Sequence, residues 1–149
     1  METLAQKLIA KASGLENFAI GDVVVCNVDL AMIHDSGGPR RVKPILDRLN
    51  LRVWDKEKVV VVTDHYVPAN NDETRAIQAL TREWVRDQDI ENFYDEQGIC
   101  HVVLPERGHL TPGKFCVGGD SHSPTGGAFG AYMFGIGATE MAGVLATGS

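Results

Sequence analysis

The chain has 149 residues, 44% of them hydrophobic and 23% charged, which predicts a single globular domain over residues 1–149. Its formal net charge of -6 argues against nucleic acid or an acidic membrane surface as a partner. Apolar runs stay shorter than the roughly 18 residues of a membrane span, and the first residues do not resemble a signal peptide, so we expect a cytoplasmic protein.

The first third of the chain contains two helical patterns and one strand-like run. Residues 3–11 are predicted as a helix. The β-branched first part of residues 23–33 predicts a buried strand, and a breaker-rich loop follows this segment. Residues 41–49 have a helical pattern in which Pro44 would have to lie in the first turn. A strand is therefore expected between two helices.

The rest of the chain repeats this alternation. Residues 59–62 are four consecutive valines, typical of a strand buried on both faces of a parallel sheet. A helix follows, for which Asn71 or Asp72 is the expected cap. Residues 114–117 are predicted as a strand, and residues 135–147 as a Gly- and Ala-rich helical region. The order predicts an α/β fold with a mainly parallel sheet and helices on both faces.

Polar residues gather where the predicted strands end. Four of the five histidines lie beside a carboxylate or an apolar run: His34 next to Asp35, His65 after Asp64, His122 two residues after Asp120, and His101 before an apolar run. A carboxylate that accepts a hydrogen bond from an imidazole fixes its tautomer and raises its basicity. Because strand ends of a parallel sheet converge, this pattern indicates an acid–base site. The fifth, His109, is expected to be an ordinary surface residue.

Other site types fit the residues less well. The segment GIGATE, residues 135–140, resembles half of a dinucleotide fingerprint but has Glu140 where the last glycine should be. The histidines lack the HxH or HxxxH spacing of a self-contained metal site. Ser121 and His122 are adjacent but lack the nucleophile elbow of a hydrolase. The three cysteines, Cys26, Cys100 and Cys116, match no zinc or iron–sulfur spacing.

Three segments form a more specific pattern. They are TDHYVPA at residues 63–69, NFYDEQGICHVVLPE at 92–106 and DSHSPTGGAFGAYMFGIGATEMA at 120–142. In this order and at these separations they resemble the aconitase superfamily, most of all the branch of 3-isopropylmalate dehydratase large subunits and homoaconitase-like relatives. The likeness runs over essentially the whole chain.

The resemblance implies a hydro-lyase that depends on a 4Fe–4S cluster. Such enzymes dehydrate a hydroxy-di- or tricarboxylic acid and rehydrate it with the hydroxyl on the neighbouring carbon. One iron of the cluster acts as a Lewis acid on the substrate hydroxyl and a carboxylate. The expected reaction is the interconversion of 3- and 2-isopropylmalate in leucine biosynthesis. Homoaconitate and methyl- or dimethylmalate are alternative substrates, and an inactive scaffold or assembly domain is the alternative from another class.

The resemblance also assigns roles to residues of this chain. In the family, the histidine of the Asp64–His65 pair protonates the leaving hydroxyl, and the residue matched by His101 is a second active-site histidine. The residues matched by Asp120 and His122 face the oxygen that the cluster binds. Substrate contacts are expected from two further residues, Ser121 and His34, the latter standing where aconitase proper has a glutamine.

Part of the family's site has no counterpart here. The cluster cysteines are expected beyond residue 149, so no metal ligand is assigned to this chain. The catalytic serine base and most substrate arginines are expected later still, some of them in a separate small subunit. We therefore expect the chain to be the N-terminal part of a longer large subunit, which works on a small hydroxy-dicarboxylate together with its small subunit.

Overall fold

The computed structural model describes residues 2–149, in which five strands form one parallel sheet. The strand order across the sheet is β3-β2-β1-β4-β5, and each neighbouring pair is parallel. The strands are β1 (Leu30–His34), β2 (Val59–Thr63), β3 (Phe93–Asp95), β4 (Phe115–Gly118) and β5 (Tyr132–Gly135). The predicted α/β class with a mainly parallel sheet is confirmed.

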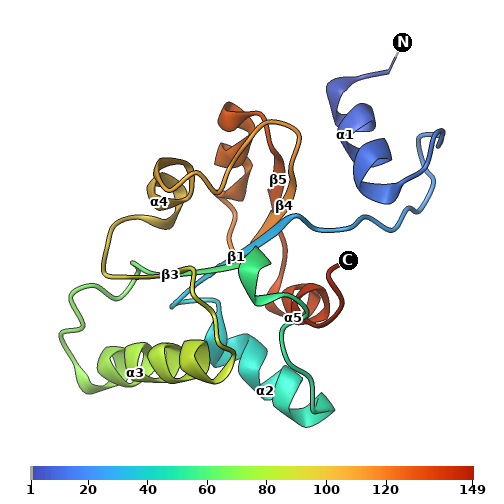
Figure 1. The fold of residues 1–149 in the computed structure, drawn as a ribbon. Coiled ribbons are helices and arrows are strands. Elements are labelled where there is room, and N and C mark those ends of the chain that lie inside the picture. The colour runs from blue at the N-terminus through green and yellow to red at the C-terminus, as the bar shows by residue number, and fades with distance from the viewer. Residues whose placement is uncertain (1) are drawn as a thin grey trace.

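Helices cover both faces of this sheet, as predicted (Figure 1). The α-helices are α1 (Leu4–Ser13), α2 (Pro39–Leu49), α3 (Asp72–Asp87), α4 (Cys100–Glu106) and α5 (Ala138–Thr147), and the short 3-10 helices are η1 (Lys56–Lys58) and η2 (Ser123–Phe129). Helices α2, α3 and α5 pack on one face, and α4 lies on the other. Within residues 2–149, no helix combines the length and the apolar character needed to cross a bilayer.

The core consists of two apolar layers separated by the sheet. Strand β1 is buried on both sides: Ala31 and Ile33 contact the layer of α2, α3 and α5, and Met32 contacts the layer of α4. The valines of β2 alternate between the same two layers, which is why residues 59–62 are uniformly apolar. Burial of strands on both faces is the expected result of helices crossing over between parallel strands.

One strand prediction needs correction, and two strands of the sheet were not predicted. The strand in residues 23–33 forms at its end, from Leu30, and not in its β-branched first part. Val23 and Val25 are 98% and 73% exposed, because only Leu30–His34 has a neighbouring strand on either side. The sheet also contains β3 and β5, of three and four residues, which the sequence patterns did not indicate.

The helix predictions were accurate in position but not always in extent. Helix α1 begins at the expected place and ends at Gly14 in the left-handed conformation. Helix α2 starts at Pro39, which places Pro44 inside the helix and not in its first turn. Asn71, one of the two expected caps, caps α3. The region predicted as helical from residue 135 contains the end of β5, and α5 begins at Ala138.

Gly135, at the end of β5, allows the chain that follows β4 to pass close by. A Cβ atom at this position would lie 2.0 Å from the carbonyl oxygen of Asp120. Backbone atoms cannot yield to such an overlap without moving the whole 119–122 loop. Gly143 in α5 has no atom within 4 Å of the corresponding position.

We therefore expect Gly135→Ala to lower the free energy of unfolding by about 1–3 kcal/mol, the usual cost of overpacking. Gly143→Ala is the matched control and should raise stability by up to about 1 kcal/mol, because alanine is the better helix former. Chemical denaturation of both variants measures the difference. Equal stability of the two variants would show that the loop adapts to the added methyl group.

Candidate active site at the carboxyl ends of the strands

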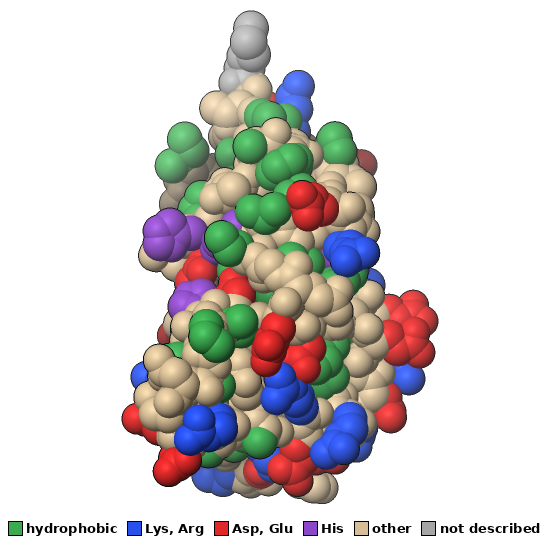
Figure 2. Space-filling model, turned by 90° about the vertical axis from the view of Figure 1, so that its left-hand side faces the viewer, with side chains coloured by type: hydrophobic (Ala, Val, Ile, Leu, Met, Phe, Trp, Pro, Cys, Tyr) green, Lys and Arg blue, Asp and Glu red, His purple; other side chains and the backbone are tan. Residues whose placement is uncertain are grey.

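The candidate site lies where the strand order reverses. The chain builds β1, β2 and β3 toward one edge of the sheet and then places β4 and β5 on the other side of β1. Ligands of open α/β sheets bind in the crevice that such a reversal leaves at the carboxyl ends of the strands. His34 ends β1 at this crevice, and the side chain of Asp120 reaches it from the loop after β4. In Figure 2, histidine side chains gather beside acidic side chains at one edge of the molecule.

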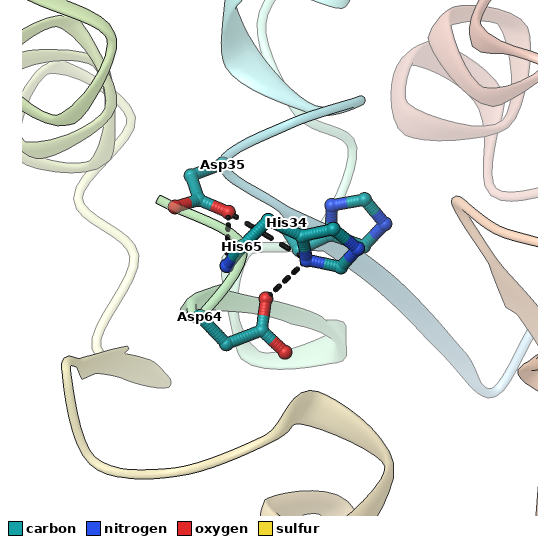
Figure 3. A group of neighbouring side chains, drawn as sticks. All are labelled: His34, Asp35, Asp64 and His65. Atoms are coloured by element: carbon teal, nitrogen blue, oxygen red, sulfur yellow. Dashed lines mark hydrogen bonds and ion pairs between the residues drawn. The ribbon is translucent and has the colours of Figure 1, made fainter. Parts of the chain in front are cut away.

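His65 lies in the loop after β2 and is contacted by two carboxylates, Asp64 of the same loop and Asp35 at the end of β1 (Figure 3). Its ring Nδ1 lies 2.6 Å from Asp64 Oδ1 and 3.9 Å from Asp35 Oδ1. Asp35 is completely buried, and its two oxygens accept the backbone N–H groups of His65 and Tyr66, each at 3.1 Å. The His65 side chain remains 40% exposed. His65 is thus held at its ring Nδ1 and at its backbone N–H, while part of the side chain stays accessible.

Asp64 also connects His65 to helix α4. Its second oxygen, Oδ2, accepts the backbone N–H of Cys100 at 2.7 Å, in the first turn of α4. Although burial favours the neutral carboxyl, the hydrogen bonds from Cys100 and His65 outweigh it and lower the pKa of Asp64 below its ordinary value. The carboxylate form of Asp64 is therefore stabilised next to His65.

A second carboxylate–histidine pair forms on the opposite side of the crevice. His101 Nε2 lies 2.9 Å from Asp120 Oδ2, and the backbone N–H of His122 donates to Asp120 Oδ1 at 3.0 Å. Burial again favours the neutral carboxyl, but the bond from His101, its charge and the His122 N–H together lower the pKa of Asp120. Ser123, which is buried, donates its hydroxyl to the Asp120 carbonyl oxygen at 2.9 Å.

His34 lies between the two pairs. Its ring stacks on that of His65, with centroids 4.0 Å apart and planes 14° from parallel, and its Nε2 lies 3.6 Å from Asp120 Oδ2. Burial and the charge of His65 lower the pKa of His34, although the nearby carboxylates oppose this. Ser36 Oγ lies 3.1 Å from Nδ1. His34 Nε2 is the one fully buried side-chain nitrogen or oxygen without a hydrogen-bond partner in the described chain.

The structure brings most of the predicted site residues into one region. The ring of His65 stacks on that of His34, and His34 Nε2 lies near Asp120 Oδ2. Asp120 also contacts His101, whose ring centroid is 6.1 Å from that of His122. Ser121 and His122 are exposed on the loop. His101 lies in the first turn of α4, so the apolar run after it is helical.

One histidine differs from its prediction. His109, expected at the surface, is partly buried and its Nε2 lies 2.6 Å from the hydroxyl of Tyr94. Burial, followed by the charge of Lys114, lowers the pKa of His109. Its hydrogen bond to Tyr94 thus lies outside the set of contacts that joins the crevice residues.

Three residues of the site had no assigned role in the sequence analysis. Asp35 was noted only as the neighbour of His34, whereas Ser36 and Ser123 were not singled out. Asp35 follows a buried strand, which is a usable signal, but its backbone partners lie 30 and 31 residues further along the chain. The two serines sit in loops where hydroxyl groups are common, so the sequence carried no signal for them.

The cysteines do not form a ligand set for an iron–sulfur cluster. Cys100 and Cys116 are buried on the α4 side of the sheet, whereas Cys26 packs against the opposite layer. Burial raises the pKa of Cys116 to about 12 and also raises the pKa of Cys100.

Two clusters of potential metal ligands are explained by hydrogen bonds within the protein. They are the group His34, Asp35, Asp64 and His65 and the group Cys100, His101 and Asp120. All four carboxylate oxygens of Asp35 and Asp64 accept hydrogen bonds from backbone N–H groups or from the His65 ring. Asp120 is likewise bonded to His101 and to the His122 N–H.

A family model described as "Aconitase family (aconitate hydratase)" matches residues 6–149. The chain belongs to the aconitase family. The resemblance of the three sequence segments is thereby confirmed, and the family membership extends over nearly all of the chain.

Individual relatives agree with this assignment. The chain is 49% identical over 148 residues to 3-isopropylmalate dehydratase large subunit 1 of Methanopyrus kandleri, covering 99% of this chain and 35% of that protein. It is 47% identical over 150 residues to a probable methanogen homoaconitase large subunit of Methanothermobacter thermautotrophicus, covering 97% of this chain and 35% of that protein. This aconitase-family chain thus spans about a third of the length of the relatives it matches.

The low pKa of Asp64 makes stability depend on pH with a definite sign. Because its pKa is lower in the folded state, the stabilisation is complete above the unfolded-state value of about 3.9 and is lost as the pH falls through the folded-state value. We expect Asp64→Asn to lower stability at neutral pH but to weaken the further loss below about pH 4. Urea denaturation at several pH values measures this, with the exposed Glu83→Gln in α3 as control. Parallel curves for wild type and Asp64→Asn would contradict it.

Proposed function

We propose that this chain supplies acid–base and substrate-contact residues to a hydro-lyase that moves a hydroxyl between adjacent carbons of a substituted malate. The proposed substrate is isopropylmalate, with the 3- and 2-isomers interconverted by dehydration and rehydration in leucine biosynthesis. The observation that carries the proposal is the convergence of two carboxylate–histidine pairs on one crevice, His65 with Asp64 and His101 with Asp120. Similarity to dehydratase large subunits supports the choice of reaction.

His65 is proposed as the acid that protonates the departing hydroxyl. Hydroxide is a poor leaving group, so a proton must reach the oxygen as the C–O bond breaks and water leaves. Asp64 binds His65 Nδ1, which leaves Nε2 as the nitrogen that delivers this proton. The proton lost from the neighbouring carbon is taken by a base outside this chain. In rehydration each transfer runs in reverse.

The other side of the crevice is proposed to orient the reacting oxygen. Asp120 holds the His101 ring through Oδ2 and the backbone of His122 through Oδ1, so one carboxylate organises both segments. Ser121, exposed on the same loop, is proposed to contact a substrate carboxylate. His34 is proposed as a further substrate contact, since its Nε2 is buried and unpartnered at the crevice.

The complete enzyme is proposed to bind a 4Fe–4S cluster through residues outside this chain and to include a small subunit. The cluster would supply a Lewis acid for the substrate hydroxyl and carboxylate. The three cysteines described above do not suit it, because Cys26 packs on one face of the sheet whereas Cys100 and Cys116 are buried on the other. The matched relatives are named as large subunits, which supports a small-subunit partner.

Homoaconitate is a second candidate substrate. The chain is 44% identical over 147 residues to the methanogen homoaconitase large subunit of Methanocaldococcus jannaschii, covering 98% of this chain and 34% of that protein. This identity is close to that of the isopropylmalate dehydratase relatives. Assays of the assembled enzyme against isopropylmalate, homoaconitate and methylated malates would decide between the substrates.

We expect His65→Asn in the assembled enzyme to lower turnover by about 100-fold or more, the usual contribution of a positioned acid. His109→Asn is the matched control, since His109 bonds Tyr94 and not the crevice residues. Steady-state rates and the iron content of both variants should be compared. Turnover of His65→Asn within a few fold of the control, with equal iron content, would refute the acid role and favour a scaffold function.

We also expect the 149-residue chain alone to hold no stoichiometric cluster and to have no hydro-lyase activity. The measurement is anaerobic reconstitution with iron and sulfide, followed by gel filtration and an absorbance spectrum. The assembled enzyme, treated in the same way, serves as the positive control. A stable 4Fe–4S spectrum that elutes with this chain would overturn the assignment of the ligands to residues outside it.

A further inference from the structure

Residues 23–28, which lead into β1, have the side-chain pattern of a strand but no neighbouring strand. Every second side chain from Val24 to Val28 is partly or fully buried, whereas Val23 and Val25 are 98% and 73% exposed. Burial at every second residue is the geometry of an extended chain with one covered face. Figure 1 shows this stretch as an open trace between α1 and β1. Its β-branched residues favour strand pairing.

The backbone of this stretch is unpaired as well. Within residues 2–149, no backbone N–H or C=O group of residues 23–26 has a hydrogen-bond partner on another backbone group. Pairing resumes at Asn27 and Val28, whose N–H groups donate to the carbonyl oxygens of Ala12 and Gly148 at 2.9 and 2.8 Å. An exposed row of free backbone groups is a template for a further strand.

An apolar groove lies beside the stretch. Its volume is about 590 Å³, and its walls include Val24 and three aromatic side chains, those of Phe115, Tyr132 and Phe134. The centroids of these three rings are between 5.5 and 5.7 Å apart. Glu140 is the one charged residue in the lining. Exposed apolar surfaces of this kind mark sites of protein interaction, so an apolar occupant is expected.

This surface lies at the end of the sheet opposite to the crevice. Residues 23–28 precede β1, so they lie toward the amino ends of the strands, whereas the crevice is at the carboxyl ends. The first residue pairs of β1 join Leu30 to Cys116 of β4 and Ala31 to Val59 of β2. Both neighbouring strands therefore begin where the stretch ends and leave it free. A partner bound here would not enter the crevice.

We propose that residues 23–26 pair with an extended apolar segment of the large subunit outside this chain, and that the same part of the subunit covers Val23 and Val25. The matched relatives are named as large subunits, and this chain spans only about a third of each, which leaves ample polypeptide to supply the segment. The inference rests on the proposal that the chain is part of a longer large subunit, and not on the acid role of His65.

Two arguments favour this occupant over a second copy of the chain. A segment of the same polypeptide is present at a high effective concentration, which a separate molecule lacks. Two copies that each carry a formal net charge of -6 would also repel each other.

The test is hydrogen–deuterium exchange with mass spectrometry on peptides that cover residues 22–28, in the 149-residue chain, the full large subunit alone and the assembled enzyme. We expect rapid exchange in the 149-residue chain and exchange slower by about 100-fold or more in the full large subunit alone. Rapid exchange in the full subunit would overturn the proposal, as would protection that appears only when the small subunit is added. Protection in the 149-residue chain that rises with its concentration would reject it in favour of a second copy.

The variant Val23→Lys tests whether the outer face is covered. Because Val23 is 98% exposed in this chain, the variant should leave the unfolding temperature of the 149-residue chain unchanged. In the full large subunit the added charge would be buried, so the unfolding temperature should fall by about 3 °C or more, or the variant should fail to fold. Val23→Thr, which keeps the β-branched shape, is the matched control. Equal unfolding temperatures of the two variants in the full subunit would contradict the proposal.

These measurements do not depend on turnover, so their outcome is distinguishable from failure of the proposed function. Slow exchange at residues 22–28 of the full subunit together with an active His65→Asn enzyme would reject the acid role alone. Rapid exchange there together with an inactive His65→Asn enzyme would reject the strand pairing alone.

Discussion

The candidate site depends on one buried carboxylate, that of Asp35. Its two oxygens accept the backbone N–H groups of His65 and Tyr66, which ties the loop after β2 to the end of β1. Buried backbone donors are costly without a partner, so these two bonds stabilise the observed path of the loop. The His65 ring is then placed over His34 and against Asp64. His34 in turn faces Asp120 across the crevice, with Nε2 and Oδ2 3.6 Å apart.

The chain reversal between β1 and β4 provides the other half of the geometry. Because β4 returns to the opposite side of β1, the loop of Asp120 faces the end of β1, although the two are far apart in sequence. Gly135 permits that loop to pass close to β5. The site is therefore assembled from strand ends that the sheet topology brings together, with the histidines held by carboxylates and backbone amides.

Much of this was predictable from patterns in the sequence, for physical reasons that can be named. The four valines of β2 are buried on both faces, and no other element accommodates such a run so well. Polar residues directly after buried strands pointed to the crevice, and parallel strands place such ends together. The resemblance to the aconitase family located Asp64, His65, His101 and Asp120, which the structure places in one region.

The failures have equally clear causes. Strands β3 and β5 are too short to show a period, and the exposed valines before β1 carry β propensity without a partner strand. The roles of Asp35 and Ser36 depend on contacts with distant backbone or with a particular ring nitrogen. Such contacts follow from the tertiary fold and leave no periodic trace in the sequence.

The double use of Asp64 limits how this site could be engineered. One oxygen serves His65 and the other the first turn of α4. A substitution meant to change the reactivity of the imidazole would therefore also disturb a helix end, and a change meant to strengthen that helix end would alter the imidazole. Directed evolution at this position cannot optimise the two properties separately, so adaptation to a new substrate should begin at Ser121, which is exposed on its loop.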